Sequence, residues 1–233
     1  MLKRWFLGSM AAFAALLLSI PAGAIGVGAG GAALIVNGTP VDLGSCETTA
    51  GGTLCSGAVQ GDTFQIDHFD LAFNADPFVL LALGVINGSA SPQTFNFTAV
   101  VPVAPVGPGL TLNGSISGSL TDGAGDGASL VDTGAPIYAA IIDGAPVRTL
   151  LDPPQAFSTT TSTTFGPAAF GPEVFAGSAG AFIAMQIQFT LSPGDAASFS
   201  SVFDVVPVPE PGTLMLVASG IAGIAARGRR RAA

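Results

Sequence analysis

The chain has 233 residues, 49% of them hydrophobic, with 32 glycines, 17 prolines and a net charge of −8. Of its 15 acidic residues only Glu210 lies outside residues 25–206, where Arg148 is the one basic residue, so this stretch carries a net charge of −13. Such a surface repels phosphate backbones, which excludes nucleic acid as a partner, and it attracts cations such as extracellular Ca²⁺.

The N-terminal end has the three parts of a secretory signal peptide. Lys3 and Arg4 form a basic region, residues 5–20 are apolar, and Ala22-Gly23-Ala24 is a small-residue cleavage signature. We expect cleavage after Ala24, because the small residues disfavour the alternative, an uncleaved anchor. The sequence therefore divides into a signal helix (1–24), a body of one domain (25–206) and a tail (207–233).

The body begins with a glycine-rich, apolar segment (25–37), which we expect to be a flexible start that joins a first edge strand. Cys46 and Cys55 follow in a stretch rich in Gly, Ser and Thr. In an exported protein two such cysteines predict a disulfide. A metal site is the lesser alternative, since zinc sites use four ligands and the chain has a single histidine.

The next segments show the two-residue alternation of β-strands. Residues 63–73 change phase near His68, which predicts a strand with a bulge. The continuous apolar run 78–86 predicts a buried strand that ends at the turn Asn87-Gly88. Residues 93–103 alternate cleanly and predict a half-buried strand.

The pattern is less decisive after residue 105. Apolar residues around Asn113-Gly114 predict either one strand or a hairpin, and residues 121–127 predict a loop. Residues 137–142 and 147–151 predict two strands about the turn Asp143-Gly144.

The last part of the body contains the strongest strand pattern. The low-complexity stretch 156–180 is compatible with a long loop or with two short strands. Residues 181–191 alternate throughout, and residues 192–195 (Ser-Pro-Gly-Asp) predict a turn into a final strand, 197–206.

No stretch of the body shows sustained helical periodicity, so we expect an all-β fold, an antiparallel β-sandwich flanked by an N-terminal signal helix and a C-terminal transmembrane helix. The 16 phenylalanines, against one Tyr and one Trp, fit a core between two sheets. They do not fit an aromatic platform for sugars.

His68 is the one candidate for a catalytic base, with Asp67 and Asp70 beside it. A hydrolytic triad also needs an activated nucleophile, and the chain has no Gly-x-Ser-x-Gly motif. Adjacent residues of a strand point to opposite faces, which separates His68 from Asp67. We therefore expect no catalytic residues; an extracellular hydrolase around His68 is the alternative.

Residues 122–127 (DGAGDG) have the alternating carboxylates and glycines of a calcium loop, and Asp132 is a possible further ligand. The loop lacks an oxygen ligand at position 124, and Thr133 stands where a glutamate is needed. We therefore expect a solvated acidic turn with no metal and no cofactor; a Ca²⁺- or carbohydrate-binding module is the alternative.

The tail begins with a rigid spacer, because Pro207, Pro209 and Pro211 favour an extended backbone. Residues 213–226 are uncharged and predict a helix about 21 Å long. A packed amphipathic helix is disfavoured, since residues 214–226 have no polar face. The predicted membrane-anchor residues are Leu214, Leu216, Val217, Ile221 and Ile224.

A cluster of arginines follows the apolar helix. We expect this cluster to remain in the cytoplasm as a stop-transfer signal, which places the body outside. A helix that spans a membrane needs about 20 apolar residues. This helix is shorter, which suits a temporary anchor. The stop-transfer residues are Arg227, Arg229, Arg230 and Arg231.

Val208-Pro209-Glu210-Pro211, the short apolar helix and the arginine cluster together resemble the PEP-CTERM sorting signal of exported bacterial proteins. The resemblance implies that Pro209, Glu210 and Pro211 are recognised by an exosortase, a membrane protease that removes the tail. It also implies transient anchoring in the membrane, then a place at the cell surface or in an extracellular matrix with exopolysaccharide. We therefore expect a non-enzymatic structural or adhesive protein.

Overall fold

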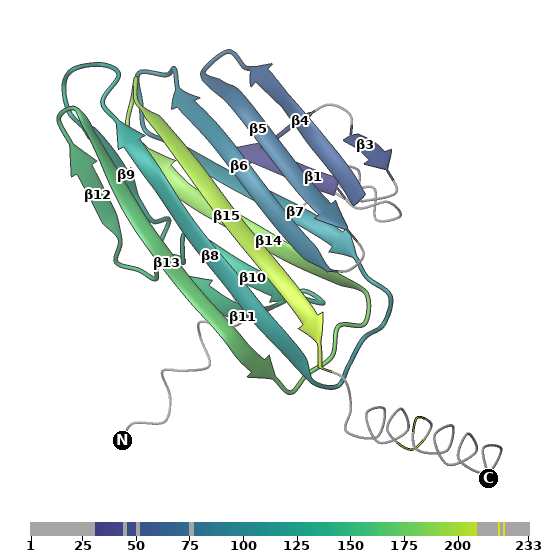
Figure 1. Ribbon diagram of the computed structural model, residues 1–233. Coiled ribbons are helices and arrows are strands. Elements are labelled where there is room, and N and C mark those ends of the chain that lie inside the picture. Colours follow the sequence, from purple (N-terminus) through teal and green to yellow (C-terminus); the bar gives the residue numbers. More distant parts are fainter. Residues whose placement is uncertain are drawn as a thin grey trace, which may run out of the picture.

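The computed structural model describes residues 31–43, 46–49, 52–74 and 77–208, together with residues 219 and 221. These residues form fifteen strands in two sheets, and every strand pair is antiparallel. The sheets pack face to face, with the seven-stranded sheet in front of the eight-stranded sheet in Figure 1. The prediction of an all-β antiparallel sandwich is confirmed.

The eight-stranded sheet, sheet A, has the order β11-β10-β14-β7-β1-β2, with β9 beside β14 and β12 beside β9. Its strands are β1 (Gly31–Val36), β2 (Thr39–Val41), β7 (Gln93–Pro102), β9 (Ala128–Val131), β10 (Tyr138–Ile142), β11 (Ala145–Leu150), β12 (Ala156–Thr159) and β14 (Phe182–Leu191).

The seven-stranded sheet, sheet B, has the order β13-β8-β15-β6-β5-β4-β3, with β15 between β8 and β6 (Figure 1). Its strands are β3 (Cys46–Thr49), β4 (Gly52–Gln60), β5 (Phe64–Asn74), β6 (Phe78–Asn87), β8 (Leu110–Thr121), β13 (Ser162–Phe175) and β15 (Ala196–Pro207).

The structure decides between the alternatives at two places and changes two further expectations. Asn113-Gly114 lies inside the single strand β8, so the hairpin alternative is wrong. β1 pairs with both β7 and β2, so it is not an edge strand. β6 buries only one face, because Leu80 is 47% exposed on the other. The stretch 156–180 forms two strands, of which β13 has 14 residues.

A chain of phenylalanine rings connects the two sheets through the core. Phe95 of β7 stacks on Phe189 of β14 at 5.4 Å, and Phe189 lies 4.6 Å from Phe199 of β15. The contacts continue from Phe199 to Phe165 of β13 and on to Phe157 of β12. Phe189 is completely buried, so it joins sheet A to sheet B at the centre of this chain.

The predicted turn at Asp143-Gly144 is confirmed as the link between β10 and β11. Both residues have positive φ, 49° and 83°, which is the geometry of the two-residue turns that suit twisted hairpins. The carboxylate of Asp143 also accepts backbone N–H bonds from Gly180 (2.6 Å), Ala181 (2.8 Å) and Phe182 (3.0 Å). Asp143 thus forms the hairpin turn with its backbone and fixes the start of β14 with its side chain.

These contacts predict that Asp143 makes the fold sensitive to acid. Burial acts to raise the pKa of Asp143, but the three N–H donors outweigh it and hold the pKa below its ordinary value of 3.8. A lowered pKa in the folded state stabilises the protein at neutral pH, and this stabilisation is lost as the pH falls through the folded pKa. We expect Asp143→Asn to lower the free energy of unfolding by about 1 kcal/mol at pH 7 and by less at pH 3. Urea titrations at both pH values would measure this, and an equal effect at both would contradict it.

Candidate functional site: the end of the last strand

The sorting tail starts where the folded body ends. In the last register pairs of β15 with β8, Val206 lies opposite Thr111 and Pro207 opposite Leu110. One residue further, the backbone N–H of Val208 donates to the carbonyl of Gly109 at 3.1 Å. The backbone is therefore held by the sandwich through Val208.

Most of the predicted tail residues lie outside the described part of the chain, and so does the signal helix at 1–24. This holds for Pro209, Glu210 and Pro211, for the anchor residues Leu214, Leu216, Val217 and Ile224, and for Arg227, Arg229, Arg230 and Arg231. Ile221 is helical and 64% exposed. Among the described residues there is no helix whose length and apolar character would let it cross a bilayer. The roles of these residues stay predictions.

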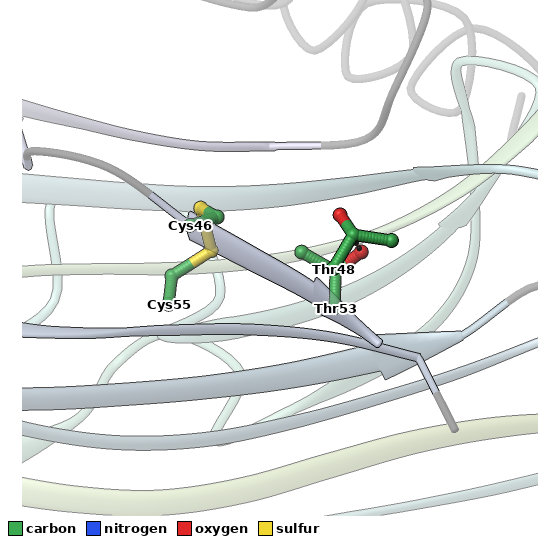
Figure 2. The surroundings of a disulfide bond; sticks show 4 residues. All are labelled: Cys46, Thr48, Thr53 and Cys55. Carbon is green, nitrogen blue, oxygen red and sulfur yellow. Dashed lines mark hydrogen bonds between the residues drawn. A yellow bond between two sulfur atoms is a disulfide. The ribbon is translucent and has the colours of Figure 1, made fainter. Parts of the chain in front are cut away.

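The two cysteines form the predicted disulfide at the edge of sheet B (Figure 2). Cys46 of β3 and Cys55 of β4 lie directly opposite each other, with their Cα atoms 4.2 Å apart. Two residues further along, the hydroxyls of Thr48 and Thr53 lie 3.2 Å apart. Because β3 is short, exposed and covalently attached to β4, it ends sheet B without offering a long free edge to another chain.

The structure places His68 on the outer face of sheet B, where its imidazole lies beside a carboxylate. The predicted bulge is present, because the register with β6 shifts between Ile66 and His68. Nδ1 of His68 lies 3.1 Å from Oδ1 of Asp67, and both side chains are about half exposed, at 50% and 45%. A side chain at Gly84 of β6 would collide with both groups.

This geometry corrects the expectation that Asp67 and His68 point to opposite faces. The bulge leaves Asp67 unpaired and turns it to the same side as His68, above Gly84. The next residue across the strands is Ser198, whose hydroxyl bonds to that of Ser119 at 2.8 Å. In the described part of the chain, this site therefore has a base, His68, and a carboxylate, Asp67, on an exposed face. The hydroxyl of the neighbouring Ser198 is hydrogen-bonded to Ser119.

A second group of polar side chains forms where the β8–β9 loop meets the β14–β15 turn. Carboxylate oxygens of Asp122, Asp126 and Asp195 lie within 4.8 Å of one another, and Asp195 is completely buried. Asp122 accepts backbone N–H bonds from Gly125 (2.6 Å) and Gly127 (3.0 Å). These oxygens could hold a hard cation, although part of their hydrogen-bonding capacity is used within the loop.

Sequence reasoning missed Asp195 and suggested Asp132 in its place. Asp132 instead accepts N–H bonds from Gly134 and Gln155, which lower its pKa and place it outside the group. Asp195 joins the loop because it accepts an N–H bond from Gly123 (3.2 Å) and a bond from the Ser192 hydroxyl. No local signal in the sequence connects residues that are more than 70 positions apart.

Comparison with known proteins identifies the tail. The family model described as the PEP-CTERM protein-sorting motif matches residues 207–231. A comparison with curated protein sequences finds no match.

Similarity to solved structures is low. One is TmCBM61 in complex with β-1,4-galactotriose, with 11% identity, TM-score 0.26, and coverage of 55% of this chain and 71% of that chain. Another is the adhesin domain of Epf from Streptococcus pyogenes, with 9% identity, TM-score 0.26, and coverage of 73% and 66%. A third is the PA14 domain of the MpAFP antifreeze protein, with 14% identity, TM-score 0.21, and coverage of 50% and 45%. Scores this low transfer no function to this chain.

The matched motif begins at Pro207, the last residue of β15, so the sorting signal starts at the point where the sandwich ends. This chain is therefore an exported protein with a C-terminal PEP-CTERM sorting signal, an exosortase substrate that is held transiently at the membrane before it reaches the cell surface or the extracellular space.

Proposed function

We propose that the mature protein is a non-enzymatic structural or adhesive component of the cell surface or matrix and that it associates with exopolysaccharide. The observation that carries the proposal is the continuity of β15 with the sorting signal, because removal of the tail then delivers the whole sandwich as one rigid unit. The proposal divides the chain into a signal peptide (1–24), a mature body (25–206) and a sorting signal (207–233).

The outer face of sheet B offers a surface for such a polymer. The register places Leu54, Ala72, Leu80 and Val202 side by side on β4, β5, β6 and β15, in a row that crosses the strands. Leu54 and Leu80 are 49% and 47% exposed. Beside this row, the outward positions of β8 and β15 are largely hydroxyl residues, namely Ser115, Ser117, Ser119, Ser198 and Ser200.

The chemistry of this face suits an uncharged polysaccharide. Sugar rings have apolar C–H faces and polar hydroxyl edges, which match an apolar row flanked by hydroxyls and by the carboxylates of Asp70 and Asp204. The one basic residue of the body, Arg148, lies on β11 of sheet A, where it pairs with Glu173. A face with acidic groups and no cations repels anionic polymers.

Sedimentation of the mature protein with polysaccharide tests the proposal. We expect the protein to co-sediment with the exopolysaccharide of the producing strain but not with alginate, an anionic polymer. The double variant Leu54→Glu/Leu80→Glu should bind about tenfold more weakly. Val174→Glu is the matched control, since Val174 is 75% exposed on the edge strand β13. A wild-type protein that stays in the supernatant would overturn the proposal.

One variant in the same experiment distinguishes the non-enzymatic protein from the alternative, a hydrolase around His68. His68→Ala should leave co-sedimentation unchanged and should leave the polymer length distribution after incubation the same as with the wild type. Shortening of the polymer by the wild type, lost in His68→Ala, would instead establish a hydrolase.

Cation binding is a second candidate function, favoured by the convergence of Asp122, Asp126 and Asp195 from two separate segments. A cation bound there would raise the midpoint of thermal unfolding by mass action. Titration with millimolar CaCl₂ should then raise the midpoint in the wild type and less in Asp126→Asn, an exposed position whose loss leaves the bonds of Asp122 and Asp195 in place. An unchanged midpoint in the wild type would exclude this function.

A further inference from the structure

The end of the sandwich from which the tail leaves carries exposed apolar side chains on the outer face of sheet B. β13 and β15 both end there, on either side of the start of β8 (Figure 1). In the register of these strands Val174 lies opposite Thr111, and Thr111 lies opposite Val206. Val174 is 75% exposed and Val206 is 46% exposed, so neither side chain belongs to the core.

Val208 extends this group toward the tail. It follows Val206 by two residues, and its N–H bond to Gly109 continues the ladder between β15 and β8, so strand alternation places both valines on the same face. Val208 is 42% exposed. Val174, Thr111, Val206 and Val208 are called the tether patch below. Apolar side chains that gather at one place on a surface indicate a contact site, whereas single scattered ones do not.

The tether patch is held close to the membrane while the tail is uncut. Only residues 209–212 separate Val208 from Thr213, where the apolar run of the sorting signal begins. In the extended form that prolines favour, this stretch spans about 16 Å. The headgroup layer of one leaflet is about 6 Å thick, so the patch lies within about 10 Å of the membrane surface. The 12 residues of β15 place the opposite end of the sandwich about 40 Å farther away.

Charged side chains favour the orientation with the tether patch toward the membrane. Asp62, after β4, and Asp126, after β8, are exposed at the opposite end of the sandwich. The one basic residue of the body, Arg148, pairs with Glu173, directly before Val174. Asp204, a further carboxylate near the patch, accepts a bond from an asparagine amide of β8. An anionic membrane surface therefore repels the opposite end more strongly than the tether end.

We propose that the tether patch rests on the lipid surface while the sorting signal is in the membrane. The valines enter the headgroup region, and the pair of Arg148 and Glu173 lies beside them. So small a patch binds lipid weakly on its own, but the tether raises its effective concentration at the surface. Cleavage of the tail removes the tether, and the body then leaves the membrane. This inference concerns a different surface from the proposed polysaccharide row and does not depend on it.

A single tryptophan tests the contact, because the one tryptophan of the chain, Trp5, lies in the predicted signal peptide. The exported, uncut chain would be purified from a host without an exosortase and reconstituted into vesicles of phosphatidylethanolamine and phosphatidylglycerol with brominated acyl chains, which quench nearby tryptophans. Relative to unbrominated vesicles, Val174→Trp should lose about half of its emission, because its ring reaches the boundary of the acyl chains. Thr160→Trp, in the turn between β12 and β13, should lose less than about 10%, because it lies about 40 Å away.

Two further variants separate contact by the patch from mere closeness to the membrane. Ala145→Trp lies at the same end of the sandwich but at the start of β11 in sheet A, so it should be quenched less than Val174→Trp. Adding Thr111→Glu to Val174→Trp places a charge at the centre of the patch and should restore most of the emission, whereas Ser115→Glu on the same strand should not.

Equal quenching of Val174→Trp and Ala145→Trp, or no quenching of Val174→Trp, would overturn the proposal. A change in the emission of Val174→Trp that required an added exosortase would also overturn it, because the patch would then contact the protease and not the lipid.

Discussion

Replacement of Glu210 by alanine is expected to leave the exported protein in the membrane fraction of a host that contains the matching exosortase. The wild type should be released or transferred to the surface without its arginine cluster. Glu210 is the only charged residue between Asp204 and Arg227, so its loss removes the only charge that the Pro-Glu-Pro motif can present to the protease. Intact-mass measurement of membrane and surface fractions would show the variant at the mass of the uncut chain.

The control for this experiment is Asp204→Asn, the nearest acidic residue on the folded side of the motif. Asp204 lies on β15, opposite Asn113, within the part of the chain held by the sandwich. We expect this variant to be processed like the wild type. Release of the Glu210→Ala protein at the wild-type rate would show that the carboxylate is not part of the recognised signal.

Replacement of Phe189 by alanine is expected to cost about 4 kcal/mol of unfolding free energy, because it removes a large aromatic side chain from the centre of the core. Phe189 is completely buried and contacts both Phe95 and Phe199, so its loss opens a cavity at the junction of the two sheets. The free energies of aromatic pairing are lost in addition to the buried area. Equilibrium unfolding in urea, followed by far-UV circular dichroism, measures the difference.

Val174→Ala provides the matched comparison, because Val174 is an apolar strand residue that is 75% exposed. It should change the unfolding free energy by less than about 0.5 kcal/mol. A Phe189→Ala protein that unfolds within about 1 kcal/mol of the wild type would mean that the neighbouring rings close the cavity.

Strands with strong alternation could be predicted from the sequence alone. Residues 93–103 and 181–191 became β7 and β14, and the turn at Asp143-Gly144 formed where both residues tolerate positive φ. In each case the signal is local, either a period of two or a dipeptide with unusual backbone freedom. The disulfide was predictable from two cysteines close together in an exported chain, and the structure places them opposite each other on adjacent strands.

Features that depend on distant residues were not predictable. Asn113-Gly114 has the composition of a turn, but β13 and β15 pair on both sides of β8 and keep the strand extended. Gly114 is needed there for another reason: the ring of Phe170 and the hydroxyl of Tyr138 occupy the space of a side chain. The approach of Asp195 to Asp122 likewise follows from the pairing of β8 with β15, in which Thr121 lies opposite Ala196.

The position of β15 between β8 and β6 has a mechanical consequence for a protein that is tethered by its C-terminal end. β15 is antiparallel to both of its neighbours, with nine register pairs to β6 and twelve to β8. A pull on Val208 acts along the strand and at right angles to the ladder hydrogen bonds, so both ladders are loaded in shear and must yield together. Tension on the tail is thus distributed over the whole middle of sheet B, which makes the sandwich a force-bearing link between its tether and whatever the opposite end of the sheet holds.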